Sequence, residues 1–256
     1  MGSTTRNYLI LYNATMGIGW TYIFYEVTKL LFITYDPISA NYVNPPSIKQ
    51  LLNVVYILQA CATLEIFHSL FGLVGGNVGA AVAQIVGRNH ILFANIYFLP
   101  ILWDHISVAY LLFFWSTIEV VRYPAYLFAL ISPDNILSRT FSWLRYTIFI
   151  PLYPLGFGTE CTFCFIHLFS KVSNRFFFSV WIYLAVLGIV YDQTVSEPLT
   201  GQAPLHTVRL PNPYNFGFDY FYFLVFFLVI AILGFINNYK YMFVQRARRY
   251  NKAKKE

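Results

Sequence analysis

The chain has 256 residues, of which 58% are hydrophobic and only 11% are charged. Soluble domains carry about 25% charged residues, so this composition excludes an ordinary soluble protein. The formal net charge is +6, and much of the excess lies close to the C-terminal end.

The apolar stretches predict a polytopic membrane protein of the all-α class. About 20 apolar residues in a helix span a bilayer core. The first stretch follows a single basic residue, Arg6, and shows no small-residue cleavage site, so we expect it to stay as an anchor. Six spanning helices are predicted, at about 8–33, 50–74, 80–102, 106–131, 143–169 and 219–241. Together they predict one membrane-embedded domain over 1–256.

One further apolar stretch, 176–191, is sixteen residues long and therefore marginal for a span. A seventh helix, a re-entrant segment and an interfacial helix all fit this length. A polar stretch rich in proline and glycine follows it.

The last part of the chain, from about 242, is a basic tail. Positive residues next to a span mark the cytoplasmic side, so the tail is predicted to be cytosolic, and with six spans the N-terminus as well. The absence of a folded module around the tail argues against nucleic-acid binding. The basic side chains are Arg246, Arg248, Arg249, Lys252, Lys254 and Lys255.

The three cysteines, Cys61, Cys161 and Cys164, all lie in apolar stretches. Their odd number argues against a disulfide framework. Cys161 and Cys164 are one helical turn apart, but no second cysteine pair completes a zinc site. We therefore interpret them as packing residues and predict no metal.

Charged side chains inside spans are rare and costly, which makes each one a functional candidate. Two sets are spaced i,i+3 and so share a helix face, Glu65 with His68 and Glu119 with Arg122. Such pairs are read equally well as structural clamps or as functional groups. The other charged residues that we single out within the predicted spans are Glu26, Arg88 and Glu160.

Glu160 differs from these pairs, because no basic residue lies within one helical turn of it in the sequence. A carboxyl group in an apolar helix suits general acid–base chemistry. Tyr153 lies seven residues earlier, on the same helix face but about 10.5 Å away along a regular helix. Pro154 and the glycines after it are expected to distort the helix and shorten that distance.

The run LRYTIFIPLYPLGFGTE, from Leu144 to Glu160, resembles the signature of the very-long-chain (3R)-3-hydroxyacyl-CoA dehydratases, also called protein-tyrosine-phosphatase-like A proteins. Further matching pieces occur in the family's order over nearly the whole chain. These are Tyr12-Asn13 with Gly19-Trp20, Leu64–Val74, Gln84 and Arg88, Trp115 with Glu119–Tyr126, and Arg209–Phe223.

The resemblance implies an enzyme of the endoplasmic-reticulum membrane with six spans and both termini in the cytosol. It implies dehydration of (3R)-3-hydroxyacyl-CoA to trans-2-enoyl-CoA in the third step of fatty-acid elongation, without a cofactor and in association with other elongation enzymes. The family's catalytic tyrosine and glutamate fall on Tyr153 and Glu160. The ending from Lys252 to Glu256 also fits a K-x-K-x-x retrieval pattern for that compartment.

The sequence departs from the family in an atypical insertion at about 176–206, and a full extra span there would break the family's topology. We therefore prefer a re-entrant or interfacial helix for 176–191. The phosphatase-like name implies no phosphatase, because no cysteine in the chain is followed by five residues and then an arginine.

Dehydration needs a base for the proton next to the thioester and a proton donor for the leaving hydroxyl. The residues alone leave open which group does which; we expect Glu160 as the base and Tyr153 as the donor. Arg122, Tyr123, Arg145 and Glu119 are candidates for contacts with the substrate, whereas Glu65 and His68 are expected to be a structural polar pair. A transporter and a non-catalytic scaffold of the elongation machinery remain as alternative functions.

Overall fold

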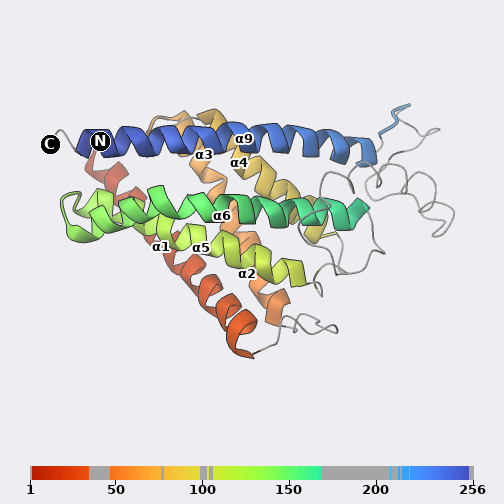
Figure 1. Cartoon of the computed structure of the whole chain (residues 1–256), viewed down its shortest axis with the longest axis horizontal. Coiled ribbons are helices and arrows are strands. Elements are labelled where there is room, and N and C mark those ends of the chain that lie inside the picture. The colour runs from red at the N-terminus through yellow and green to blue at the C-terminus, as the bar shows by residue number, and fades with distance from the viewer. Residues whose placement is uncertain are drawn as a thin grey trace. The chain divides into compact units, whose positions relative to one another are not determined.

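The computed structural model describes residues 2–34, 47–75, 78–98, 103, 106–168, 208, 213, 215–218 and 220–253 (Figure 1). These residues are almost entirely helical, apart from an isolated antiparallel bridge between Val208 and Phe218. The predicted all-α class is thereby confirmed. The segment 176–191 and the insertion 176–206 lie outside the described residues.

The chain divides into two compact units, one made of Met1–Thr159 with Ile236–Glu256 and the other of Glu160–Phe235. The two boundaries each fall inside a long helix, one between Thr159 and Glu160 and the other between Phe235 and Ile236. The prediction of one membrane domain over 1–256 stays a prediction.

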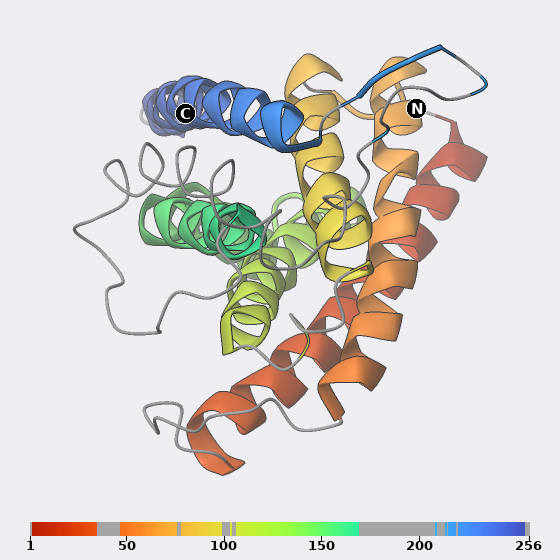
Figure 2. The ribbon, with the colours of Figure 1, turned by 90° about the vertical axis from the view of Figure 1, so that its right-hand side faces the viewer.

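In the first unit, α1 (Ser3–Lys29) packs along α5 (Ile106–Ile131) and also contacts α2 (Ser47–Ala62) (Figure 2). The inward face of α1 repeats at helical spacing, with Leu9, Met16, Trp20, Ile23 and Val27 all buried. Large apolar side chains on its other face, such as Leu11 and Ile18, are exposed, as expected for a helix in contact with lipid.

A close approach between α1 and α2 depends on Gly19. A Cβ atom at this position would lie 2.6 Å from the Leu58 side chain, so a larger residue would force the two helices or that side chain to move.

A second group of helices in this unit surrounds the carboxyl end of α2. The short helix α3 (Leu64–Leu70) follows α2 directly, and α4 (Val78–Asn89) packs against both of them. Two π-helical segments extend longer helices, η1 (Leu30–Thr34) after α1 and η2 (His90–Ile96) after α4.

Two long helices complete the described chain, α6 (Ile136–Leu168) and α9 (Tyr220–Ala253). The helix α6 continues through Pro151 and Pro154, so the expected distortion does not interrupt it. The helix α9 continues to Ala253, and the basic residues Arg246, Arg248 and Arg249 therefore lie on its last turns.

Three described helices are long and apolar enough to cross a membrane by length and composition, Ser47–Leu70, Ile106–Ile131 and Val225–Arg249. They correspond to three of the six predicted spans, so six spans are not confirmed. The other three predicted stretches are also helical, over α1, α4 with η2, and α6. Polar side chains in α1 and the Pro, Gly, Thr and Glu residues of α6 lower the hydropathy of those two helices, and α4 has only 12 residues.

Candidate active site

A cavity of about 630 Å³ opens in the first unit, between side chains of α1, α3, α4, α5, α6 and α9. This volume is within the usual range for small-molecule sites. Five of the residues singled out in the sequence line it together, Glu65, His68, Arg122, Arg145 and Tyr153. They come from three different helices, so only the tertiary fold brings them together.

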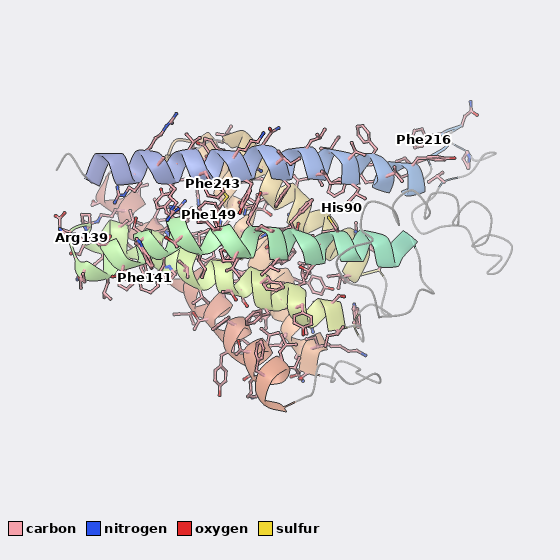
Figure 3. All side chains as sticks on the ribbon, viewed as in Figure 1. His90, Arg139, Phe141, Phe149, Phe216 and Phe243 are labelled. Carbon is pink, nitrogen blue, oxygen red and sulfur yellow. The ribbon has the colours of Figure 1, made fainter. Side chains whose placement is uncertain are left out.

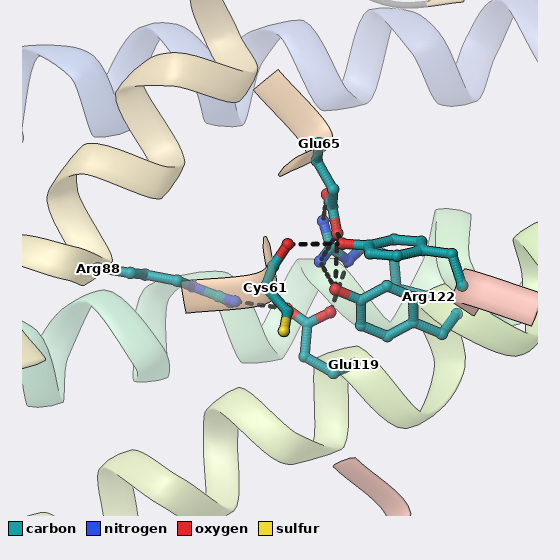
Figure 4. Close-up of polar contacts among 7 residues, drawn as sticks. Cys61, Glu65, Arg88, Glu119 and Arg122 are labelled. Carbon is teal, nitrogen blue, oxygen red and sulfur yellow. Dashed lines mark hydrogen bonds and ion pairs between the residues drawn. The ribbon is translucent and has the colours of Figure 1, made fainter. Parts of the chain in front are cut away.

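Glu119 of α5 lies behind the cavity wall, and its side chain is fully buried. One carboxylate oxygen accepts a hydrogen bond from Arg122 Nε at 2.6 Å, and the other bonds to Arg88 of α4 (Figure 4). The guanidinium of Arg88 also lies over the Trp115 ring, 5.0 Å from its centroid. Glu119 thus joins two arginines from two helices.

Arg122 connects this buried pair to Glu65 on α3. Its two terminal nitrogens donate to the two Glu65 oxygens at 2.8 and 3.0 Å, which is the bidentate geometry that arginine favours with carboxylates. Tyr123 donates its hydroxyl to Glu65 at 2.6 Å, and Tyr12 of α1 donates to the same carboxylate at 3.4 Å. Four helices therefore meet at one chain of polar contacts, which we call the Glu65–Arg88 network: Tyr12, Glu65, Arg88, Glu119, Arg122 and Tyr123.

The Glu65–Arg88 network contains two carboxylates and two guanidiniums in alternation, so their formal charges cancel. Breaking such a set by removing one member leaves an uncompensated buried charge, which is strongly destabilising. The arrangement both holds α1, α3, α4 and α5 together and presents one guanidinium, that of Arg122, to the cavity.

His68 lies on the same cavity wall and is buried, with 5% of its surface exposed. Its Nε2 shares a hydrogen bond of 2.8 Å with the hydroxyl of Tyr8, and its ring stands edge-on to Tyr8 and Tyr12. Glu65 therefore bonds to Arg122 of another helix, and His68 bonds to α1, instead of forming the pair predicted from their spacing. The predicted pair of Glu119 with Arg122 is confirmed at 2.6 Å.

The helix α6 contributes Tyr153, which is half-buried, and Arg145 to the cavity lining. The Arg145 guanidinium lies 4.5 Å from the Tyr126 ring centroid and 5.4 Å from that of Tyr146. Stacking of this kind holds the cation in place without neutralising it. The cavity is thus lined by two arginines, Arg122, which is paired with carboxylates, and Arg145, which lies against aromatic rings.

Comparison with known proteins places the chain in a family. The model of the family described as "Protein tyrosine phosphatase-like protein, PTPLA" matches residues 59–252. The chain belongs to this family. The matched stretch contains every charged member of the Glu65–Arg88 network together with Tyr153 and Glu160, whereas Tyr8 and Tyr12 precede it.

Several curated relatives of this PTPLA member carry the name very-long-chain (3R)-3-hydroxyacyl-CoA dehydratase. Those from Gallus gallus and Danio rerio are 30% and 29% identical over 98% of the chain, which spans 59% and 60% of their length. The Arabidopsis thaliana relative named PASTICCINO 2 is 29% identical, with 98% of this chain and 96% of that relative covered. No solved structure matches the chain significantly.

Three residues that the sequence predicted to belong to the site are absent from the cavity lining. Glu119 and Tyr123 lie behind its wall in the Glu65–Arg88 network. Glu160 is half-buried on α6 and is the first residue of the second unit, so its pairing with Tyr153 stays a prediction. Among the described residues, no group of three or more His, Cys, Asp or Glu side chains gathers to hold a metal ion.

Spacing along one helix did not indicate the bonds of Arg88 to Glu119, Arg122 to Glu65 and Tyr8 to His68, because each joins two helices. The sequence feature that indicated bonds of this kind was the presence of several charges within apolar stretches, because each such charge requires a partner.

Proposed function

We propose that this PTPLA member dehydrates (3R)-3-hydroxyacyl-CoA to trans-2-enoyl-CoA, the third step of long- and very-long-chain fatty-acid elongation. The names of its relatives support the reaction, and the apolar helices support a membrane setting. The observation that carries the proposal is Tyr153, whose ring lines a cavity that also receives the guanidiniums of Arg122 and Arg145.

The proposed reaction requires one proton to leave the carbon next to the thioester and one to reach the departing hydroxyl. Glu160 takes the first, and the electrons of that C–H bond form the new double bond. The bond from the β-carbon to oxygen breaks, and Tyr153 supplies the proton that lets the hydroxyl leave as water. Return of the proton from Glu160 to the phenolate, through solvent, restores both groups.

Negative charge develops on the thioester oxygen during this step, and donors placed for it lower the barrier. Arg145 suits this task because it lines the cavity and is held there by aromatic rings. Arg122 also lines the cavity, but its nitrogens bond to Glu65 and Glu119, so it is the second candidate. Tyr123 and Glu119 already bond inside the Glu65–Arg88 network, so we assign them to holding Arg122 in place and not to direct contact with the substrate.

We further propose that the protein resides in the endoplasmic-reticulum membrane, with its C-terminus in the cytosol. The basic end of α9 and the K-x-K-x-x ending support this orientation. The acyl chain would lie among apolar side chains, and the CoA phosphates would meet Arg139, Arg145 or the tail. Other elongation enzymes are the expected partners, and the reaction requires no cofactor.

Turnover of long-chain 3-hydroxyacyl-CoA by the detergent-purified full chain tests this proposal. Formation of the 2-enoyl product is expected for the wild type. Tyr153→Phe and Glu160→Gln should each lower kcat by about 10²–10⁴-fold, because each removes a proton-transfer group. The matched controls Tyr22→Phe and Glu26→Gln make the same chemical changes on α1, where Tyr22 is exposed and Glu26 is partly exposed, and should retain activity.

Folding of each variant is verified by its thermal unfolding in the same detergent. A folded Tyr153→Phe or Glu160→Gln variant with full turnover would remove that residue from the mechanism. A wild-type protein that forms no enoyl product would overturn the proposed function, and accumulation of unconverted substrate inside sealed vesicles would indicate a transporter.

A further inference from the structure

The second proline of α6 creates an irregularity next to Tyr153. In an α-helix each carbonyl accepts a hydrogen bond from the amide four residues later. For Ile150 that residue is Pro154, which has no N–H. The Ile150 carbonyl therefore lacks its regular helical donor, three residues before Tyr153.

Tyr239 of α9 supplies a donor at this point. Its hydroxyl bonds to the Ile150 carbonyl at 2.9 Å. Unsatisfied backbone groups are costly where water is scarce, so this bond compensates for the missing amide and fixes α9 against α6. Both residues belong to the first unit.

The ring of Tyr239 also lies parallel to that of Tyr153. Their centroids are 5.9 Å apart and their planes differ by 3°. Phe149 and Phe243 meet the Tyr239 ring edge-on, at 6.0 and 5.0 Å. Figure 3 labels these two phenylalanines. Tyr239 is thus held by two rings and one hydrogen bond while its face covers one side of Tyr153.

Tyr239 is absent from the cavity lining, whereas two of the rings that it contacts, Tyr153 and Phe149, are part of it. Of these two, only Tyr153 carries a hydroxyl that can donate a proton. We propose that Tyr239 is a positioning residue that bonds to the carbonyl left open by Pro154 and sets the orientation of the Tyr153 ring for proton donation. This inference rests on the proposed function, in which Tyr153 is the donor.

A double-mutant cycle between Tyr239 and Pro154 tests the proposal in the purified full chain. Tyr239→Phe keeps the ring and removes the hydroxyl; we expect kcat to fall about 10-fold with KM nearly unchanged, because misplacement of a reacting group lowers the rate. Tyr239→Leu removes the ring as well, and we expect a loss of about 100-fold. Tyr222→Phe, at an exposed tyrosine of the same helix, is the matched control and should keep the wild-type kcat.

Pro154→Ala restores an amide that can donate to the Ile150 carbonyl. In that background, Tyr239→Phe should lower kcat by less than about 3-fold, so that the two changes are not additive. A residue that only packs α9 against α6 would show the same loss in both backgrounds. Equal losses, or full kcat in a folded Tyr239→Phe variant, would overturn the positioning role.

Thermal unfolding of the four proteins of this cycle tests the bond between Tyr239 and Ile150 independently of the proposed function. A wild-type protein without turnover overturns both the function and the positioning role. The unfolding midpoints test the hydrogen bond itself, because Tyr239→Phe should lower the midpoint of the wild-type chain and lower that of the Pro154→Ala variant less. Equal shifts would contradict the bond, whatever the activity.

Discussion

The helices on the two sides of the cavity are joined by different chemistry. On the side of α1, α3, α4 and α5, charged groups link the helices through the Glu65–Arg88 network. On the side of α6 and α9, aromatic rings and the hydroxyl of Tyr239 link the two helices within the first unit.

This difference has a physical basis in the membrane setting. Lipid tails are as apolar as leucine, so apolar contact alone gives little drive for helices to associate, and hydrogen bonds and shape must select the partners. Charged contacts have a defined geometry and a large cost when broken. Aromatic contacts are weaker and tolerate small shifts. The charged side is therefore expected to be the more rigid wall of the site.

The largest effect should follow loss of the central carboxylate. Glu119→Gln keeps the shape of the side chain but leaves the two buried arginines, Arg88 and Arg122, with Glu65 as the one remaining carboxylate of the network. We therefore expect a loss of about 3–5 kcal/mol in the free energy of unfolding. Denaturation of the detergent-solubilised protein by increasing amounts of sodium dodecyl sulfate measures it. A loss below about 1 kcal/mol would mean that the network does not hold these helices.

A smaller effect is expected on the aromatic side. Phe243→Leu retains an apolar side chain and removes the edge contacts with Phe149 and Tyr239, which lie at 5.2 and 5.0 Å. Such ring pairs contribute about 0.5–1.5 kcal/mol beyond buried area, so we expect a loss of about 1 kcal/mol in the same assay. A loss as large as that of Glu119→Gln would contradict the proposed contrast between the two walls.

The smallest effect is expected at an ion pair on the outside of α1. Glu26 lies 3.1 Å from Lys29, with side chains 27% and 44% exposed. Exposed pairs contribute little to stability, so Glu26→Gln should leave the unfolding transition unchanged within error. Because the chemical change equals that of Glu119→Gln, the comparison isolates the effect of burial, and a clear shift at Glu26 would indicate that burial is not the cause.

The sequence by itself determined the class of this protein. Low charge and long apolar stretches required helices in a membrane, since only helices and closed barrels satisfy the backbone there. The i,i+3 spacing identified the pair of Glu119 with Arg122, and the run from Leu144 to Glu160 identified the family. These features are local, and therefore readable along the chain.

Only the tertiary structure decided which groups meet across helices. Glu65 bonds to Arg122 and not to His68, Arg88 bonds to Glu119, and Tyr239 reaches the carbonyl that Pro154 leaves open. Each of these contacts depends on how two helices pack, and residues 31 to 89 positions apart in the chain carry no spacing signal for it. The sequence indicated that charges within apolar stretches need partners, and the packing of the helices determined which partners they have.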